Sequence, residues 1–331
     1  MRRLRLTSER KSIAYFQSAR LQREKDPWNG LYSHMFIEDV KYNIMPIGGE
    51  SKTHPEFDVI LEPSKSDNED VLRVAFSTDG DVKSTLREAT SRFITDCAMQ
   101  LAYQGETHYE IVRGDPKEFQ DGITFRHVKL PIDASNLCQP LYICGDVLRI
   151  PGYYFQIVPR AEWGSQKKVF VLISANSVLS IKLPSQLGSR SSHAKLLKTL
   201  MKYGMPLPKF VNYDPKGDST QRNFSFSDFH LYTDLRIAME SALWGWPARQ
   251  LWEKRILEYY LVYRNLRFAR SMAILREHIL LSINNLLQRT SIQGQLVIKG
   301  LPTSDTLQEA LSQLESGNIS FDDVLNLTNL Q

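Results

Sequence analysis

Three side chains that could do chemistry alternate along the stretch "ETHYEIVR". Glu106, His108 and Glu110 stand at every second position, so on a β-strand they share one face. Tyr109 and Ile111, which alternate with the last two of them, are apolar and suit a core. The alternation predicts a strand with its apolar face inward and the three polar side chains toward water or another subunit. A metal-binding or catalytic face is the alternative.

A zinc site is the chemistry that His108 and Glu110 suggest most directly. Zinc deaminases place a ligand histidine two residues from a general acid–base glutamate, but they also need a Cys-x-x-Cys pair. The two cysteines that follow, Cys138 and Cys144, are six residues apart in a stretch flanked by Pro and Gly. That spacing does not fit, so we expect no metal and read the run as an ordinary strand.

Other catalytic patterns are weak or missing. Ser192 and Lys195 have the spacing of a serine–lysine nucleophile, but Ser192 stands where a helix cap is expected, and capping is the simpler reading. The sequence has no phosphate-binding loop, no G-x-S-x-G turn and no H-E-x-x-H pair. We therefore expect a protein that is not an enzyme and binds no cofactor.

Arginines recur along the longest stretch without Gly or Pro, which runs from Pro247 to Gly294. Arg264, Arg267 and Arg270 step by three and would drift slowly around one side of a helix, and Arg276 continues the basic bias. Such a stripe could follow nucleic-acid phosphates. The alternative is that these arginines pair with acidic groups, within the chain or on a neighbouring copy.

Aromatic residues cluster just before and within the same stretch. Enrichment in arginine and aromatic residues is typical of subunit interfaces, although an intramolecular core is the usual alternative. The candidate interface aromatics are Trp244, Trp246, Trp252 and Tyr260.

Opposite charges are sorted into separate blocks along the 331 residues, whose net charge is +4. Residues 1–25 carry eight Lys/Arg against two Asp/Glu, and residues 26–165 carry 13 against 22. Residues 166–301 carry 20 against eight, and the remaining thirty carry none against five. A block with a net charge of +12 can attract a polyanion or an acidic neighbouring subunit.

The positioning elements follow from periodicity and punctuation. Apolar residues at three- and four-residue steps predict a helix over residues 84–104, ended by Gly105. Strands are expected at "FDVILE", at its predicted neighbour "VLRVAF", and at "THYEIVR", "ITFRHVKLPI", "YYFQIVP" and "KKVFVLI". Helices are expected at "SSHAKLLKTLMKYG", in the long stretch, where one helix could exceed ~60 Å, and at "TSDTLQEALSQLESGN".

The predicted fold class is α+β, with a mainly β part that holds one prominent helix, followed by a mainly helical part with a long helix. Four segments are expected along the chain. They are a basic arm over residues 1–25, a β-rich wing-like domain over 26–184, a basic helical region (stem- or crown-like) over 185–301, and an acidic helical tail over 302–331.

Residues 84–184 contain a succession that resembles the wing region of tailed-bacteriophage portal proteins. It runs through "RFITDCAMQLAYQGETHYEIVR", "VKLPIDASNL" and "YYFQIVPRAEWGSQKKVFVLISANSVLSIKLP". In that family an amphipathic helix leads into a tyrosine- and glycine-containing turn and a strand, and later strands follow a Leu-Pro pair. The matching residues here are Tyr103, Gly105, Tyr109, Glu110 and Val112 for the turn and strand, and Leu130-Pro131 and Asn176-Ser177-Val178-Leu179 for the later strands.

The resemblance implies a homo-oligomeric ring at a capsid vertex through which double-stranded DNA is packaged and ejected. Its partners would be other copies of itself, the DNA, and capsid, adaptor or packaging-motor proteins, in the virion and, during assembly, in the host cytoplasm. The alternative is a cytoplasmic nucleic-acid-binding protein that uses the basic stripe. No apolar run is long enough to span a membrane, and three cysteines without paired spacing indicate a reducing compartment.

Overall fold

The computed structural model describes fourteen stretches of the chain, and everything below concerns them. They are residues 31–45, 57–63, 66–76, 84–113, 123–127, 137–138, 141–143, 146–148, 153–157, 170–174, 178–203, 226–248, 258–288 and 294–328. The predicted basic arm and Trp252 lie outside these residues. The described chain divides into two compact units. Unit 1 draws on residues 1–25, 57–182 and 279–299, and unit 2 on residues 26–56, 183–278 and 300–331.

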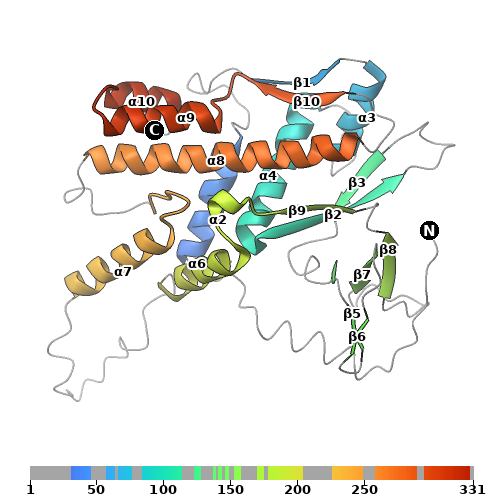
Figure 1. The fold of residues 1–331 in the computed structure, drawn as a ribbon, viewed down its shortest axis with the longest axis horizontal. Coiled ribbons are helices and arrows are strands. Elements are labelled where there is room, and N and C mark those ends of the chain that lie inside the picture. The colour runs from blue at the N-terminus through green and yellow to red at the C-terminus, as the bar shows by residue number, and fades with distance from the viewer. Residues whose placement is uncertain are drawn as a thin grey trace. The chain divides into compact units, whose positions relative to one another are not determined.

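The prominent helix of unit 1 is α4, Leu86–Gln104, and it confirms the sequence prediction (Figure 1). Thr85 caps its start: the Thr85 hydroxyl accepts from the Glu88 amide at 3.2 Å, and the Glu88 carboxylate accepts from the Thr85 amide at 2.9 Å. Gly105 ends it in the left-handed conformation at φ 77°. The helix buries a stripe that includes Ala89, Phe93, Cys97 and Leu101.

Replacing Thr85 with alanine is expected to lower the free energy of unfolding by about 1 kcal/mol, because the hydroxyl of the capping box is lost. Urea denaturation followed by circular dichroism measures the change. Thr85→Ser keeps the hydroxyl and should cost only a small part of it. Equal losses in the two variants would show that the methyl group, and not the cap, matters at this position.

The segment "VLRVAF" is helical, so the prediction of a strand there is wrong. It belongs to α3, Ser66–Phe76, which has Asp67 and Glu69 in its first turn, where acidic groups favour a helix. Its buried side chains Leu72, Ala75 and Phe76 recur at helical spacing, and the Phe76 ring packs against Phe93 at 4.9 Å between centroids.

The strand "FDVILE" is confirmed as β1, Asp58–Glu62, but its neighbour comes from far along the chain. It pairs antiparallel with β10, Gln295–Lys299. Lys299 Nζ lies 2.7 Å from Glu62 Oε1. Gly294 leads into β10 at φ 130°, and a Cβ there would lie 2.8 Å from a methyl group of Leu61. The position therefore needs glycine.

The remaining sheets are small and antiparallel. In the first, β2 (Glu106–Arg113) lies between β3 (Ile123–His127) and β9 (Val178–Lys182). The second contains β4 (Leu137–Cys138), β7 (Tyr153–Ile157) and β8 (Phe170–Ser174), and the third pairs β5 (Leu141–Ile143) with β6 (Asp146–Leu148). The strands predicted over these residues are confirmed.

Helices nevertheless account for most of the secondary structure in the described residues. Within residues 26–184 the strands share the chain with α2, α3 and α4, so a mainly β part is not shown there. The fold class is α+β with small sheets.

Unit 2 is helical in its described residues. It holds α2 (Leu31–Ile44), the short 3-10 turn η4 (Ser185–Leu187), α6 (Arg190–Tyr203), α7 (Phe226–Glu240), α9 (Ser304–Glu315) and α10 (Phe321–Thr328). It also takes the larger part of α8, Glu258–Leu287, whose last nine residues fall in unit 1. With 30 residues, α8 is about 45 Å long, shorter than the ~60 Å that the uninterrupted stretch allowed.

The acidic tail folds onto the first half of α8. Val262, Leu266 and Ala273 of α8 share one apolar cluster with Leu307, Ala310, Leu311 and Leu314 of α9 and Val324 of α10. The Thr303 hydroxyl caps α9 by accepting from the Thr306 amide, and Gly317 follows the helix at φ 73°. The helix predicted for the tail is thus confirmed, with α10 as an addition.

Candidate subunit interface

The residues first singled out for chemistry belong to the interior of unit 1. Thr107, His108 and Tyr109 of β2 are all buried, so the expectation that His108 faces water or another subunit is wrong. The strand is covered on both faces at these positions. The Cys97 thiol donates a hydrogen bond to the Tyr109 hydroxyl at 3.2 Å. Burial raises the pKa of both groups, which keeps the thiol protonated and unreactive.

Ser192 and Lys195 also have structural roles. The Ser189 hydroxyl accepts from the Ser192 amide, and the Ser192 hydroxyl donates to the Ser189 carbonyl at 2.8 Å, as at a helix start. Lys195 Nζ lies 2.9 Å from Glu240 Oε1 and so joins α6 to α7. The segment does begin a helix, but the prediction that Ser192 caps it is wrong, because the capping residue is Ser189.

Among the described residues, no group of three or more His, Cys, Asp or Glu side chains could hold a metal ion. None of the helices in the described part of the chain is both long and apolar enough to cross a bilayer.

Arg264 is buried, with only 6% of its surface exposed. Its guanidinium donates to the Ala238 carbonyl at 3.3 Å, to the Ser241 hydroxyl at 3.1 Å and to the Trp246 carbonyl. These acceptors lie in α7 and in the turn that follows it, so Arg264 fixes that turn to α8. Burial lowers the pKa of Arg264; Tyr260 acts in the opposite direction, and the nearby charge of Arg267 lowers the pKa further.

Arg276 is the second buried arginine, with 8% of its surface exposed. It donates to the Ile44 carbonyl at 3.3 Å and to the Pro302 carbonyl at 2.5 Å. It thereby joins the end of α2 to the segment before α9. Burial lowers its pKa to about 10, with Glu277 acting in the opposite direction.

The sequence suggested one exposed basic stripe, but the four arginines do not form one. Arg264 and Arg276 are occupied by main-chain carbonyls inside unit 2 and have no face for a phosphate or a second subunit. Arg267 and Arg270 are half-buried, and the Arg267 guanidinium lies 5.7 Å from the centre of the Tyr263 ring. For these two, a role in contact with nucleic acid or another subunit stays a prediction.

The tryptophans are core residues of unit 2. Phe36 of α2 meets Trp244 edge-on at 5.1 Å and Trp246 at 5.3 Å, and Trp246 Nε1 donates to Asp39 Oδ2 at 2.8 Å. Gly245 between them has φ +65°, and a Cβ there would lie 2.4 Å from the Arg267 Cβ. Of the predicted interface aromatics, only Tyr260 is exposed among the described residues. Trp244 and Trp246 are not available to a partner.

An apolar face that the sequence analysis did not single out lies on α7 and its following turn. Tyr232, Leu235, Met239 and Leu243 are 51%, 54%, 66% and 52% exposed. Steps of three, four and four residues place them on one side of the helix, opposite Ile237 and Ser241, which are buried. Contiguous exposed apolar side chains of this kind mark interaction surfaces. We call these four residues the α7 face.

Comparison with known proteins finds a structural similarity but no match in sequence. No family model matches the chain, and no curated protein matches it. The fold is similar to a chain in the solved virion of a native gene transfer agent (GTA) particle, with 12% sequence identity and a TM-score of 0.47, over 100% of this chain and 96% of that one. An identity and a score this low establish neither a family nor a function.

Proposed function

We propose that this chain is a structural protein of a virion that assembles with copies of itself, as a portal-type ring at a capsid vertex. The proposal has two parts. Self-assembly rests on a surface of the folded chain, and the portal type rests on the sequence resemblance of residues 84–184.

The exposed apolar α7 face is the observation that supports self-assembly. Four large apolar side chains, each more than half exposed, would leave water if this face met another subunit. Full burial of a fully exposed side chain of this size contributes roughly 1.5–3 kcal/mol, so the exposed part of each contributes about half of that. Arg236 frames the face: its Nε donates to the Tyr232 hydroxyl at 3.2 Å. An apolar centre with a polar rim is the usual anatomy of a protein–protein contact.

The portal type draws on the corner between α4 and β2. The resemblance to portal wings implies an amphipathic helix, a glycine turn and a strand whose neighbours come later in the chain. In unit 1, α4 ends at Gly105, β2 follows at once, and β9 pairs with β2 in the register Tyr109 to Leu179. This arrangement agrees with the helix-to-strand corner of a portal wing, and it makes the Glu106–Glu110 run a structural element.

We further propose that the chain has no catalytic activity of its own. Fewer of the candidate arginines could contact phosphates in the nucleic-acid-binding alternative, because Arg264 and Arg276 are buried. It would depend on Arg267 and Arg270 and on basic residues outside the described ranges.

The double substitution Leu235→Asp and Met239→Asp is expected to reduce the assembled protein to single chains. Two carboxylates in the centre of the contact would have to be desolvated without partners. Both side chains are exposed in the single chain, so the fold should survive. Sedimentation velocity gives the masses present, and circular dichroism checks the helices.

Leu281→Asp is the matched control, because Leu281 is 57% exposed but belongs to α8 and is not one of the four residues of the α7 face. It should leave the distribution of masses unchanged. Assembly that persists in the α7 double variant would remove this face from the interface and with it the observation on which self-assembly rests.

A further inference from the structure

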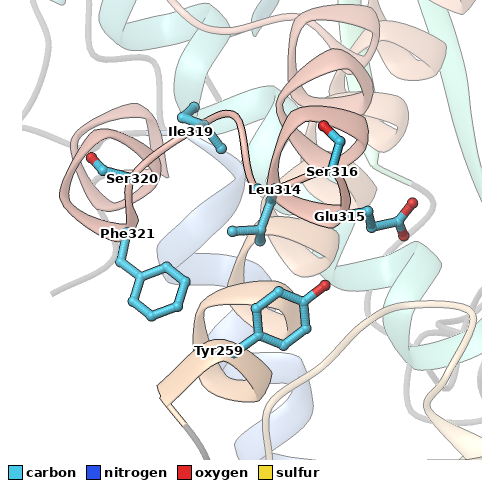
Figure 2. A pocket seen from close by; sticks show the side chains of 8 residues that line it. Tyr259, Leu314, Glu315, Ser316, Ile319, Ser320 and Phe321 are labelled. Atoms are coloured by element: carbon cyan, nitrogen blue, oxygen red, sulfur yellow. The ribbon is translucent and has the colours of Figure 1, made fainter.

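A second apolar surface of unit 2 is an open hollow of about 670 Å³ between the start of α8 and the turn that joins α9 to α10 (Figure 2). Figure 2 shows Leu314 and the rings of Phe321 and Tyr259 facing the same space, with Glu315 pointing away from it. Ile319 adds to the apolar lining. Because Tyr259 is 41% exposed, part of this apolar lining is accessible to another protein surface.

The walls of the hollow are ordered in the single chain. On one wall, Tyr259 stacks on Tyr263 at 6.0 Å between ring centroids and lies 6.3 Å from the ring of Phe321. On the other, the Ser320 hydroxyl accepts from the Asp323 amide at 3.2 Å and so caps α10. A surface that is already formed costs little entropy to order when a partner binds it.

Helix α8 separates the hollow from the α7 face. Val262 and Leu266 of α8 pack in one apolar cluster with α9 and α10, whereas Arg264, midway between them, donates to the Ala238 carbonyl of α7. Two residues along a helix correspond to a rotation of about 200°. The α9–α10 pair and α7 therefore lie on opposite sides of α8, so their exposed surfaces can meet only between different copies of the chain.

The charges of the two surfaces are complementary. Arg236 is exposed on α7 and donates to the Tyr232 hydroxyl of the α7 face. The two rings of the hollow each have an exposed acidic neighbour in the sequence, Glu258 or Asp322, and we call this pair the acidic rim. Residues 302–331 contain no Lys or Arg. An apolar surface that carries a cation thus fits an apolar surface with an acidic rim.

The acidic side chains described on α7 do not oppose this match. Glu240 lies 2.9 Å from Lys195 of α6, with which it forms an ion pair. Asp234 stands seven residues, or about two turns, before the buried Ser241 and so lies on the buried side of the helix. Among the described side chains of α7, Arg236 is therefore the charged group nearest to the exposed apolar face.

We propose that the α7 face of one copy docks in the hollow of the next copy. Leu235 and Met239 then lie against the ring of Tyr259. Arg236 faces Asp322 in the acidic rim. This inference rests on the proposed function, because it names the second half of the self-assembly contact. A contact between two different surfaces leaves one α7 face and one hollow unfilled at the ends of every row of copies, until the row closes as a ring.

Mixing two variants that each lack one half of the contact tests this pairing. The first is the chain with Leu235→Asp and Met239→Asp. The second, the hollow variant, carries Tyr259→Lys and Asp322→Lys; both replaced side chains are exposed, so the fold should survive. Sedimentation velocity should find single chains for each variant alone. An equimolar mixture should double that mass to two chains and no more, because the intact hollow of the first variant accepts the intact α7 face of the second.

Tyr42→Lys together with Glu309→Lys is the matched control, because it changes an exposed tyrosine and an exposed acidic residue that belong to neither surface. This control should assemble like the natural chain, and circular dichroism checks the helices of every variant. A hollow variant that assembles like the natural chain overturns the pairing, and so does a mixture that stays as single chains. Either result leaves self-assembly standing, whereas a natural chain that stays single overturns the proposed function as well.

Discussion

Replacing Arg264 with alanine is expected to lower the free energy of unfolding by about 3 kcal/mol. The guanidinium serves three acceptors at once, the carbonyls of Ala238 and Trp246 and the Ser241 hydroxyl. Truncation would leave these groups buried without a charged donor and would open a cavity beside α7. The loss is measured as a lower midpoint in urea denaturation.

Two control variants separate the hydrogen bonding of the Arg264 guanidinium from the effect of its positive charge alone. Arg264→Lys keeps the cation but loses the planar fork that reaches several acceptors, so it should recover only part of the stability. Arg267→Ala removes a half-buried neighbour three residues away and should cost clearly less than Arg264→Ala. If Arg264→Ala were as stable as the natural chain, Arg264 could not be what fixes the turn after α7.

Replacing Trp246 with alanine should lower the free energy of unfolding by about 3–5 kcal/mol, the largest effect we expect from a single substitution in unit 2. The indole is fully buried against Phe36, and its N–H bonds Asp39. The variant loses the ring contact and the hydrogen bond together. Denaturant unfolding followed by far-ultraviolet circular dichroism measures the change.

Tyr42→Ala is the comparison for this variant, since Tyr42 is an aromatic residue of the same helix as Phe36 but is 63% exposed. Its stability should lie within about 0.5 kcal/mol of the natural chain. A Trp246→Ala chain that unfolds at the natural midpoint would show that this tryptophan does not hold α2 to the turn after α7.

Local features were predictable where capping residues and periodicity agree. The ends of α4 followed from Gly105 and its apolar steps, and those of α9 from Thr303 and Gly317, because each terminus carries a residue suited to its backbone conformation. "VLRVAF" was misassigned as a strand because a short apolar run fits both the helical and the strand period. The partner of β1 could not be foreseen either, since β10 lies more than 230 residues further along.

The arginines show why the site was harder to predict than the elements. Spacing placed Arg264, Arg267 and Arg270 near one side of a helix, but it says nothing of what that side meets. Main-chain carbonyls accept hydrogen bonds from the buried guanidinium groups of Arg264 and Arg276, and no residue type in the sequence marks such carbonyls. The α7 face could have been found from its three- and four-residue steps, but apolar steps on a helix usually mean core.

Burial also changes how the arginine stripe is best tested. Replacing Arg264 together with Arg267 and Arg270 would mix an effect on contacts with a loss of stability. The double variant Arg267→Gln and Arg270→Gln avoids this. It leaves the buried Arg264 in place, so an effect on DNA contact is separated from a loss of stability. The readout is the affinity for DNA at rising salt concentration, because binding through phosphates weakens steeply with salt.

Light scattering of the natural chain, coupled to size-exclusion chromatography, tests the central claim most directly. A self-assembling virion protein should elute with a mass that is a multiple of 38.1 kDa, well above two chains. A single species with the mass of one chain, at concentrations at which a virion would assemble, would contradict it.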